Sequence, residues 1–198
     1  MTFKIGKKNV GSKFQPLIIA EIGINHNGSI REAKKLVDSA KKAGAEIIKH
    51  QTHVLDDEMA EEAKKITPSH TKETIYEIMK KCALNEKDEL ELMRYVKKLG
   101  MIYISTPFSK LAVDRLVKFK VPAFKIGSGE CNNYPLIEYI AKQKKPIILS
   151  TGMNTIKTIK PAVQIFRKFK VPYALLHCTN IYPTPTNQVR LDAIDKLK

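Results

Sequence analysis

The sequence predicts an α/β fold, a (β/α)8 TIM barrel truncated after about six βα units, and three observations support this prediction. Short apolar segments alternate with amphipathic helical segments along the 198-residue chain. Strands separated by helices imply a parallel sheet with helices packed outside it. Polar side chains also follow every expected strand, which favours a barrel over an open doubly wound sheet, because an open sheet binds ligand at one crevice.

The expected strands are short and rich in Ile, Val, Leu or Tyr. They are residues 16–22, 45–49, 101–105, 123–126, 146–149 and 173–176. A longer excursion, residues 51–84, follows the second of them.

The expected helices have recognisable ends. A capping box of Ser29 and Glu32 begins the first helix, which ends at Gly44. Asn85 caps the second, which stops at Gly100. Further helices are expected at about 109–119, 133–143, 154–169 and 187–197. The chain ends inside a helical pattern, so we expect one incomplete barrel domain, residues 1–198, that is inactive alone.

The net charge of +15 raises the question of nucleic-acid binding. The lysines read as scattered over helical segments without interleaved aromatic residues, so we predict solvated helix faces, no nucleic-acid partner and easier recruitment of an anionic substrate. No apolar run of membrane-spanning length and no signal-peptide pattern occurs, which predicts a cytoplasmic protein without a membrane partner. The three cysteines lack metal-site or disulfide spacing.

One loop looks built for an anion. Lys125 ends an apolar strand, and Gly127, Ser128, Gly129 and Glu130 follow. Glycine backbone freedom would let amide N–H groups and the Ser128 hydroxyl close around a phosphate or carboxylate beside the lysine charge. The alternative is an ordinary glycine turn with a solvated lysine.

Polar residues at the other strand ends extend this site. Cations, hydroxyls and an asparagine suit a small phosphorylated acid, whereas carboxylates, an amide and a tyrosine suit sugar hydroxyls. The candidate residues, in chain order, are Glu21, Lys49, Gln51, Thr106, Lys125, Ser128, Glu130, Ser150, Asn180 and Tyr182. They indicate an enzyme for a phosphorylated acid and a polyhydroxylated partner. Tyr182 to Pro185 has the alternative interpretation of a rigid turn.

The histidines are a weaker signal. His50 and His53 should point to opposite faces of a strand. We therefore predict structural hydrogen bonds rather than a zinc site for His26, His50, His53 and His177.

Six ordered motifs closely resemble the sialic acid synthase family, from about residue 16 to the end. They are residues 19–28, 49–53, 105–109, 125–133, 149–153 and 177–185. The resemblance implies condensation of phosphoenolpyruvate with an N-acetylated hexosamine (N-acetylmannosamine) to give N-acetylneuraminic acid and phosphate. It also implies a homodimer and an antifreeze-like C-terminal domain that this chain lacks.

The resemblance implies roles for the candidate residues. Lys49, Thr106, Lys125, Ser128, Ser150 and Asn180 would hold phosphoenolpyruvate. Gln51, Glu130 and Tyr182 would lie near the sugar and Glu21 near a divalent Mn²⁺ or Mg²⁺, with Glu21 and Glu130 catalytic. The metal's protein ligands are expected beyond residue 198. His70 departs from the family, because close relatives have asparagine there.

Two alternatives stay open. The sequence also suits a legionaminic or pseudaminic acid synthase of the same family. A different class of function is a truncated chain that binds anions without catalysis.

Overall fold

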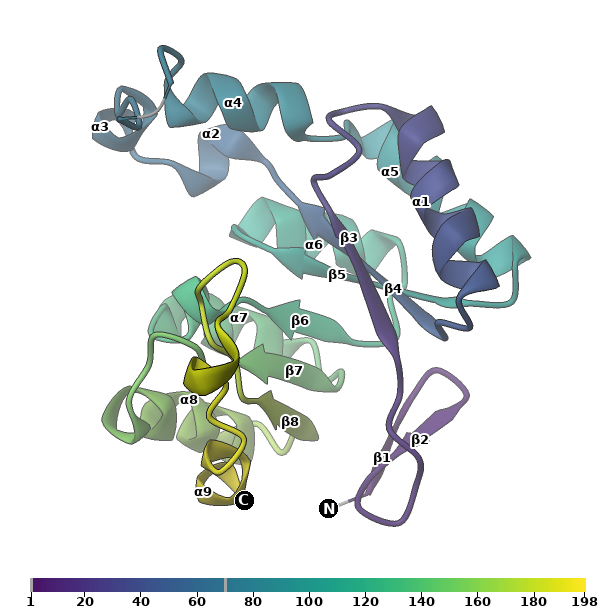
Figure 1. Ribbon diagram of the computed structural model, residues 1–198, viewed down its shortest axis with the longest axis vertical. Coiled ribbons are helices and arrows are strands. Elements are labelled where there is room, and N and C mark those ends of the chain that lie inside the picture. Colours follow the sequence, from purple (N-terminus) through teal and green to yellow (C-terminus); the bar gives the residue numbers. More distant parts are fainter. Residues whose placement is uncertain (1, 70) are drawn as a thin grey trace.

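A computed structural model describes residues 2–69 and 71–198, so the departure noted at His70 lies outside the described residues. The described chain contains one curled sheet of six parallel strands in sequence order (Figure 1). They are β3 (Ile19–Gly23), β4 (Ile47–Thr52), β5 (Ile102–Pro107), β6 (Phe124–Ile126), β7 (Ile147–Ser150) and β8 (Tyr173–Leu176). The α/β prediction is confirmed, and the sheet has the form of a half-barrel. A complete eight-unit barrel stays a prediction.

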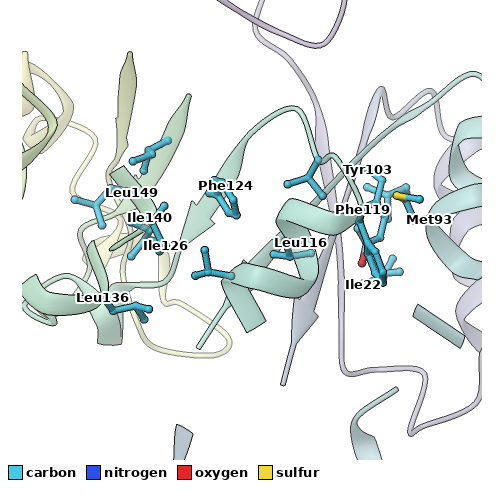
Figure 2. Close-up of a cluster of buried hydrophobic side chains, with 14 of the residues drawn as sticks. Ile22, Met93, Tyr103, Leu116, Phe119, Phe124, Ile126, Leu136, Ile140 and Leu149 are labelled. Carbon is cyan, nitrogen blue, oxygen red and sulfur yellow. The ribbon is translucent and has the colours of Figure 1, made fainter. Parts of the chain in front are cut away.

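The long helices cover the convex face of this sheet (Figure 1). They are α1 (Ile30–Lys42), α5 (Glu86–Lys98), α6 (Lys110–Lys118), α7 (Tyr134–Lys142) and α8 (Ile156–Lys168). The main core lies between the two layers, where Tyr103 and Phe124 of the sheet join Leu116 and Phe119 from α6 and its C-cap (Figure 2). Burial of these large side chains is the chief stabilising term and fixes each strand against its helix.

The two predicted helix caps are present, with one exception in detail. The Ser29 hydroxyl accepts the Glu32 N–H at 3.3 Å, and the Asn85 side chain accepts the Asp88 N–H at 2.9 Å. The Glu32 carboxylate, however, pairs with Lys35 at 2.9 Å. The expected capping box is therefore only half formed, because the neighbouring lysine holds the carboxylate.

The helices share one way of ending. In the described chain, each long helix is followed by a residue with positive φ: Gly44, Gly100, Lys120, Lys144 and Lys170. This left-handed residue reverses the chain toward the next strand. Glycine adopts it readily, whereas lysine meets a steric cost.

Some of the basic residues that the sequence interpretation treated as scattered are grouped at helix ends. Each long helix carries basic residues in its last turn, such as Lys41 and Lys42 in α1. In alternating βα units the helices run antiparallel to the strands, so these turns gather at the amino-terminal edge of the sheet. There the positive charges interact favourably with the helix dipoles.

The excursion after β4 forms α2 (Leu55–Glu58), α3 (Glu61–Lys64) and α4 (Ile75–Cys82). The Asp57 carboxylate accepts the Leu111 N–H at 2.9 Å, which ties α2 to the start of α6. Asp56 accepts hydrogen bonds from Lys64 at 3.0 Å and from the Tyr76 hydroxyl at 3.1 Å. These contacts fasten the excursion to the carboxyl-terminal edge of the sheet.

A hairpin of β1 (Phe3–Ile5) and β2 (Lys8–Val10) precedes the sheet and was not predicted. Gly6 makes its tight turn with φ of +57°. Ile5 is buried in a second core cluster with Ile47, Ile104, Ala123 and Ile148. The hairpin therefore packs against the apolar floor of the concave face.

The last helix is shorter than expected. Instead of 187–197, the chain forms a 3₁₀ turn at Thr186–Gln188 and α9 at Ala193–Leu197. No side chain caps α9 and none of its residues is buried, so little stabilises a longer helix. Within the described ranges, no helix is both long and apolar enough to cross a membrane.

Replacing Lys170 by glycine should stabilise the protein. Its φ is +53°, so Lys170→Gly relieves left-handed strain and should raise the unfolding free energy by about 0.5–1 kcal/mol. The measurement is chemical denaturation, with Lys160→Gly, at an exposed position within α8, as the control. That control should lose about 1 kcal/mol. An equal loss of unfolding free energy in both variants would show that the backbone at Lys170 is not strained.

Candidate active site

The concave face of the sheet changes from apolar to polar along the strands. Because strand side chains alternate with a period of two, the residue two positions after each floor residue faces the same way. Following Ile47, Ile104, Ala123 and Ile148 of the floor, these residues are Lys49, Thr106, Lys125 and Ser150. The sequence therefore places cations and hydroxyls at the carboxyl end of the half-barrel, above an apolar base.

Two buried lysines dominate this polar layer, each with 6% of its surface exposed. The Lys49 ammonium forms an ion pair with Glu21 and lies 3.3 Å from the Thr106 hydroxyl. The Lys125 ammonium donates to the Ser150 hydroxyl at 2.6 Å and to the Ile126 carbonyl at 2.8 Å. The structure thus makes two lysine–hydroxyl pairs on four successive strands.

The electrostatics of this layer favour an anion. Burial, and then the charge of Lys49, lower the pKa of Lys125 to about 8. Among the described residues, no carboxylate lies within ion-pair distance of Lys125, so its ammonium loses solvation without gaining an anionic partner. A bound anion would relieve both effects, so the layer can act as an anion site.

Ser128 links two of the loops at the carboxyl end of the half-barrel, which we call the mouth. It begins a 3₁₀ turn, Ser128–Glu130, after β6. Its hydroxyl accepts the Gly152 N–H at 3.1 Å, and its carbonyl accepts the Asn154 side-chain amide at 2.8 Å. These bonds hold the loop after β6 against the loop after β7.

The predicted role of the glycines is not confirmed. Gly127 has φ of −70°, and Gly129 is also outside the left-handed region. The N–H groups of Glu130 and Cys131 donate to the carbonyls of Gly127 and Ser128, so they close the turn. The loop is a short helical turn that other residues could form, because its backbone lies in an ordinary region.

Glu130 is anchored by the helix that follows it. Its carboxylate accepts the Asn133 side-chain N–H at 2.7 Å, while the Asn133 oxygen caps α7 through the Leu136 N–H at 3.3 Å. Asn133 therefore fixes Glu130 relative to the start of α7.

Glu21 and Gln51 meet beside Gly23. A Cβ at Gly23 would lie 3.6 Å from Glu21 Oε1 and 3.8 Å from Gln51 Nε2. The Glu21 side chain is 51% exposed. Its carboxylate therefore pairs with Lys49 and also remains accessible at the mouth.

The two candidates after β8 differ. Asn180 lies against Gly152, where a Cβ would come within 1.7 Å of Asn180 Oδ1, so this approach requires glycine. Tyr182 is 89% exposed and is not brought into the cluster.

The histidines contact different elements, as their spacing predicts. His50 stacks on His26 behind the sheet, with Nε2 atoms 3.1 Å apart, and lies 3.2 Å from the Tyr103 hydroxyl. His53 instead contacts Glu58 and Phe108 near the mouth. Sequence reasoning missed Glu58 and Phe108, because only the fold of the excursion brings Glu58 next to the strand end.

A buried carboxylate, Glu89 on α5, completes the network behind the sheet. It accepts the Tyr103 hydroxyl at 3.0 Å and the Arg115 guanidinium at 3.1 Å. Burial opposes its charge, but hydrogen bonds from His50 and Thr52 and the Arg115 charge hold the pKa of Glu89 below its ordinary value. Burial and His50 also lower the pKa of His26, to about 4. This network braces the strands from behind.

Among residues 2–69 and 71–198, no three His, Cys, Asp or Glu side chains are grouped closely enough to enclose a metal ion. A cavity of about 810 Å³ lies elsewhere, between α8, β8 and α9, and is lined by Tyr173, Leu175 and His177. These side chains point to the convex face of the sheet, whereas the lysines lie on its concave face. The cavity is therefore separate from the polar layer.

Comparisons with known proteins agree with this arrangement. The NeuB family model matches residues 36–198. An uncharacterized protein of Methanocaldococcus jannaschii is 44% identical over 98% of this chain and 55% of its own length. The N,N'-diacetyllegionaminic acid synthase of Campylobacter jejuni is 39% identical over 92% of this chain and 57% of that enzyme. The chain thus spans about half the length of the curated relatives it matches.

A solved structure is also similar. The N-acetylneuraminic acid synthetase of Leptospira borgpetersenii, in complex with citrate, superposes with a TM-score of 0.89 at 29% identity. The similarity covers 100% of this chain and 66% of that chain.

The buried lysine should make stability depend on pH. Lys125 has a folded pKa of about 8 and an ordinary value of 10.5, so the unfolded state binds more protons between these values. Stability therefore rises with pH across this window. We expect the unfolding free energy of the wild type to gain about 3 kcal/mol relative to Lys125→Met between pH 8 and 10.5.

Denaturant titrations of both proteins across this pH range measure that gain. Exposed Lys120→Met, compared with the wild type in the same way, should show no such trend. A constant difference between wild type and Lys125→Met would show that Lys125 is not a desolvated cation.

Proposed function

This chain belongs to the NeuB family, and from that premise we propose that it forms the phosphoenolpyruvate-binding part of a synthase of 2-keto sugar acids. The reaction proposed is the condensation of phosphoenolpyruvate with an N-acetylated aminosugar, which releases phosphate. Relatives named as synthases of such acids support this proposal.

The observation that carries it is the pair of buried lysines on one concave face. Lys49 with Thr106 and Lys125 with Ser150 are two cation–hydroxyl pairs. Phosphoenolpyruvate carries two anionic groups, a phosphate and a carboxylate, on adjacent atoms. Each group would take one pair, through charge-assisted hydrogen bonds. Ser128 and Asn180, on either side of Gly152, would extend the same anion site.

The sugar would lie above this layer. Gln51 beside Gly23 offers an amide, and Glu130 offers a carboxylate that Asn133 holds in place. Glu130 would position a sugar hydroxyl or move a proton there. The sugar side of the proposal rests on these two residues, because Tyr182 stands outside the cluster.

A divalent Mn²⁺ or Mg²⁺ fits the donor type at Glu21, whose half-exposed carboxylate is a hard oxygen ligand at the mouth. When bound, such an ion supplies Lewis-acid polarisation of the sugar aldehyde. Glu21 would hold it from one side and also orient Lys49. The remaining ligands would come from outside residues 1–198.

The identity of the sugar divides the family. N-Acetylmannosamine is the first candidate, since the superposed structure is that of an N-acetylneuraminic acid synthetase. The legionaminic precursor is the alternative, favoured by the 39% identical relative. A product assay of the full-length protein with competing sugars, including the pseudaminic precursor, decides among them. Anion binding without any product would instead favour the non-catalytic alternative.

Loss of either lysine should weaken phosphoenolpyruvate far more than the sugar. In Lys49→Ala or Lys125→Ala, one charge-assisted contact is lost, which corresponds to roughly 30- to 150-fold in affinity. Calorimetric titration of the full-length protein measures this, with exposed Lys13→Ala as control. Unchanged affinity in both lysine variants would refute the anion site.

Glu130→Gln should separate binding from turnover. The amide keeps the side chain's shape but cannot accept a proton, so turnover should fall roughly 100-fold or more while phosphoenolpyruvate affinity changes little. Steady-state assays across pH test this, with Glu138→Gln on the outer face of α7 as the matched control. Normal turnover in Glu130→Gln would remove Glu130 from the mechanism.

A further inference from the structure

A histidine and a carboxylate form a tight pair at the mouth, and the proposed function gives them no role. Nδ1 of His53 lies 2.9 Å from Oε1 and 3.1 Å from Oε2 of Glu58. Only 4% of the His53 side chain and 7% of the Glu58 side chain are exposed. A charged group so well covered needs a partner, and each supplies it to the other.

The ring of His53 is restrained on two further sides. It stacks on Phe108 at the end of β5, with ring centroids 4.4 Å apart and planes 9° apart. Its Nε2 lies 3.4 Å from Oε1 of Gln51, at the long end of hydrogen bonding. His53 therefore connects Glu58 of the excursion to Gln51 of β4.

Hydrogen-bond chemistry fixes the protons along this chain of groups. A carboxylate only accepts, so Nδ1 of His53 carries a proton. The Gln51 oxygen also accepts, so its contact with Nε2 is a hydrogen bond only when Nε2 carries a proton too. In that state His53 is an imidazolium, the form that pairs with a negative Glu58. A neutral ring would instead offer the Nε2 lone pair and draw the amide NH2 toward itself.

The state of His53 thus decides which atom Gln51 offers to the mouth. With its oxygen on His53, the Gln51 NH2 group points toward β3, 3.8 Å from the Cβ position of Gly23. Glu21 Oε1 approaches that position at 3.6 Å. Gln51 accordingly presents donors on this side. If the amide turned over, it would present an acceptor.

The excursion keeps Glu58 in place. Glu58 is the last residue of α2, and Asp57, one residue before it, accepts the Leu111 N–H at 2.9 Å. A helix of one turn has little stability alone, so this docking sets where Glu58 lies.

We propose that Glu58 and His53 are a positioning pair that holds the Gln51 amide with its NH2 toward the mouth. In this orientation Gln51 selects a sugar that offers an acceptor oxygen there, such as the carbonyl of an N-acyl group, over a sugar with a free ammonium. The selection rests on the proposed function, whereas the orientation of the amide does not.

The test has a spectroscopic arm and a kinetic arm, both on the full-length protein. ¹⁵N NMR of histidine-labelled protein, with His53 assigned through His53→Asn, reports which ring nitrogens carry protons. Steady-state assays compare N-acetylated and unacylated aminosugars for the wild type and Glu58→Gln. Glu61→Gln, an exposed carboxylate on α3, is the control with the same charge change.

We expect both His53 ring nitrogens to be protonated in the wild type at neutral pH, and Nε2 to lose its proton in Glu58→Gln. That variant should raise KM for the N-acetylated sugar roughly tenfold, leave phosphoenolpyruvate affinity within about twofold, and lower the preference for the acylated sugar. Glu61→Gln should match the wild type.

An unprotonated Nε2 in the wild type would overturn the proposal without any variant. Equal sugar preference in Glu58→Gln and Glu61→Gln would also overturn it. If the wild type makes no product, the proposed function fails, and the spectroscopic arm still decides the orientation of Gln51.

Discussion

The burial of two lysine ammonium groups on one concave face is the constraint on which the rest of this structure depends. Desolvated like charges oppose folding, as the lowered pKa of Lys125 indicates. The fold tolerates them because Glu21 pairs with Lys49, and because hydroxyls of Thr106 and Ser150 accept hydrogen bonds. The free protein keeps the unfavourable free energy of burying the two ammonium groups, and a bound anion relieves it. The protein is thus less stable without the anion, and the anion binds more tightly.

The scaffold around the lysines makes this burial possible. The apolar floor directly below them excludes water, and the β1–β2 hairpin packs against that floor. Behind the sheet, the Glu89 network and the main core fix the strands that carry Lys49 and Thr106. At the mouth, side chains from separate loops brace one another, as Ser128 does with Gly152. The lysines therefore lie on rigid elements, and the distance between them is fixed before a ligand binds.

Much of this could be predicted from the sequence, and the exceptions have physical reasons. Lys49, Thr106, Lys125 and Ser150 follow strands whose period of two fixes their direction, so local pattern was sufficient. The strands of the hairpin around Gly6 have three residues each, which is too short for a period of two to show. The pairing of His53 with Glu58 and the exposure of Tyr182 depend on how the loops after the strands fold. The gathering of the basic last helical turns at one edge follows from the topology of the βα units, which the order of residues alone does not reveal.

Proton uptake on binding tests the central claim most directly. Because Lys125 has a pKa of about 8, a bound anion should raise it, and phosphoenolpyruvate should bind with uptake of protons near pH 8. Calorimetric titrations of the full-length protein in two buffers of different ionisation enthalpy measure this uptake. The account predicts an uptake approaching roughly half a proton per site, lost in Lys125→Met. Binding with no uptake, or uptake unchanged in the variant, would contradict it.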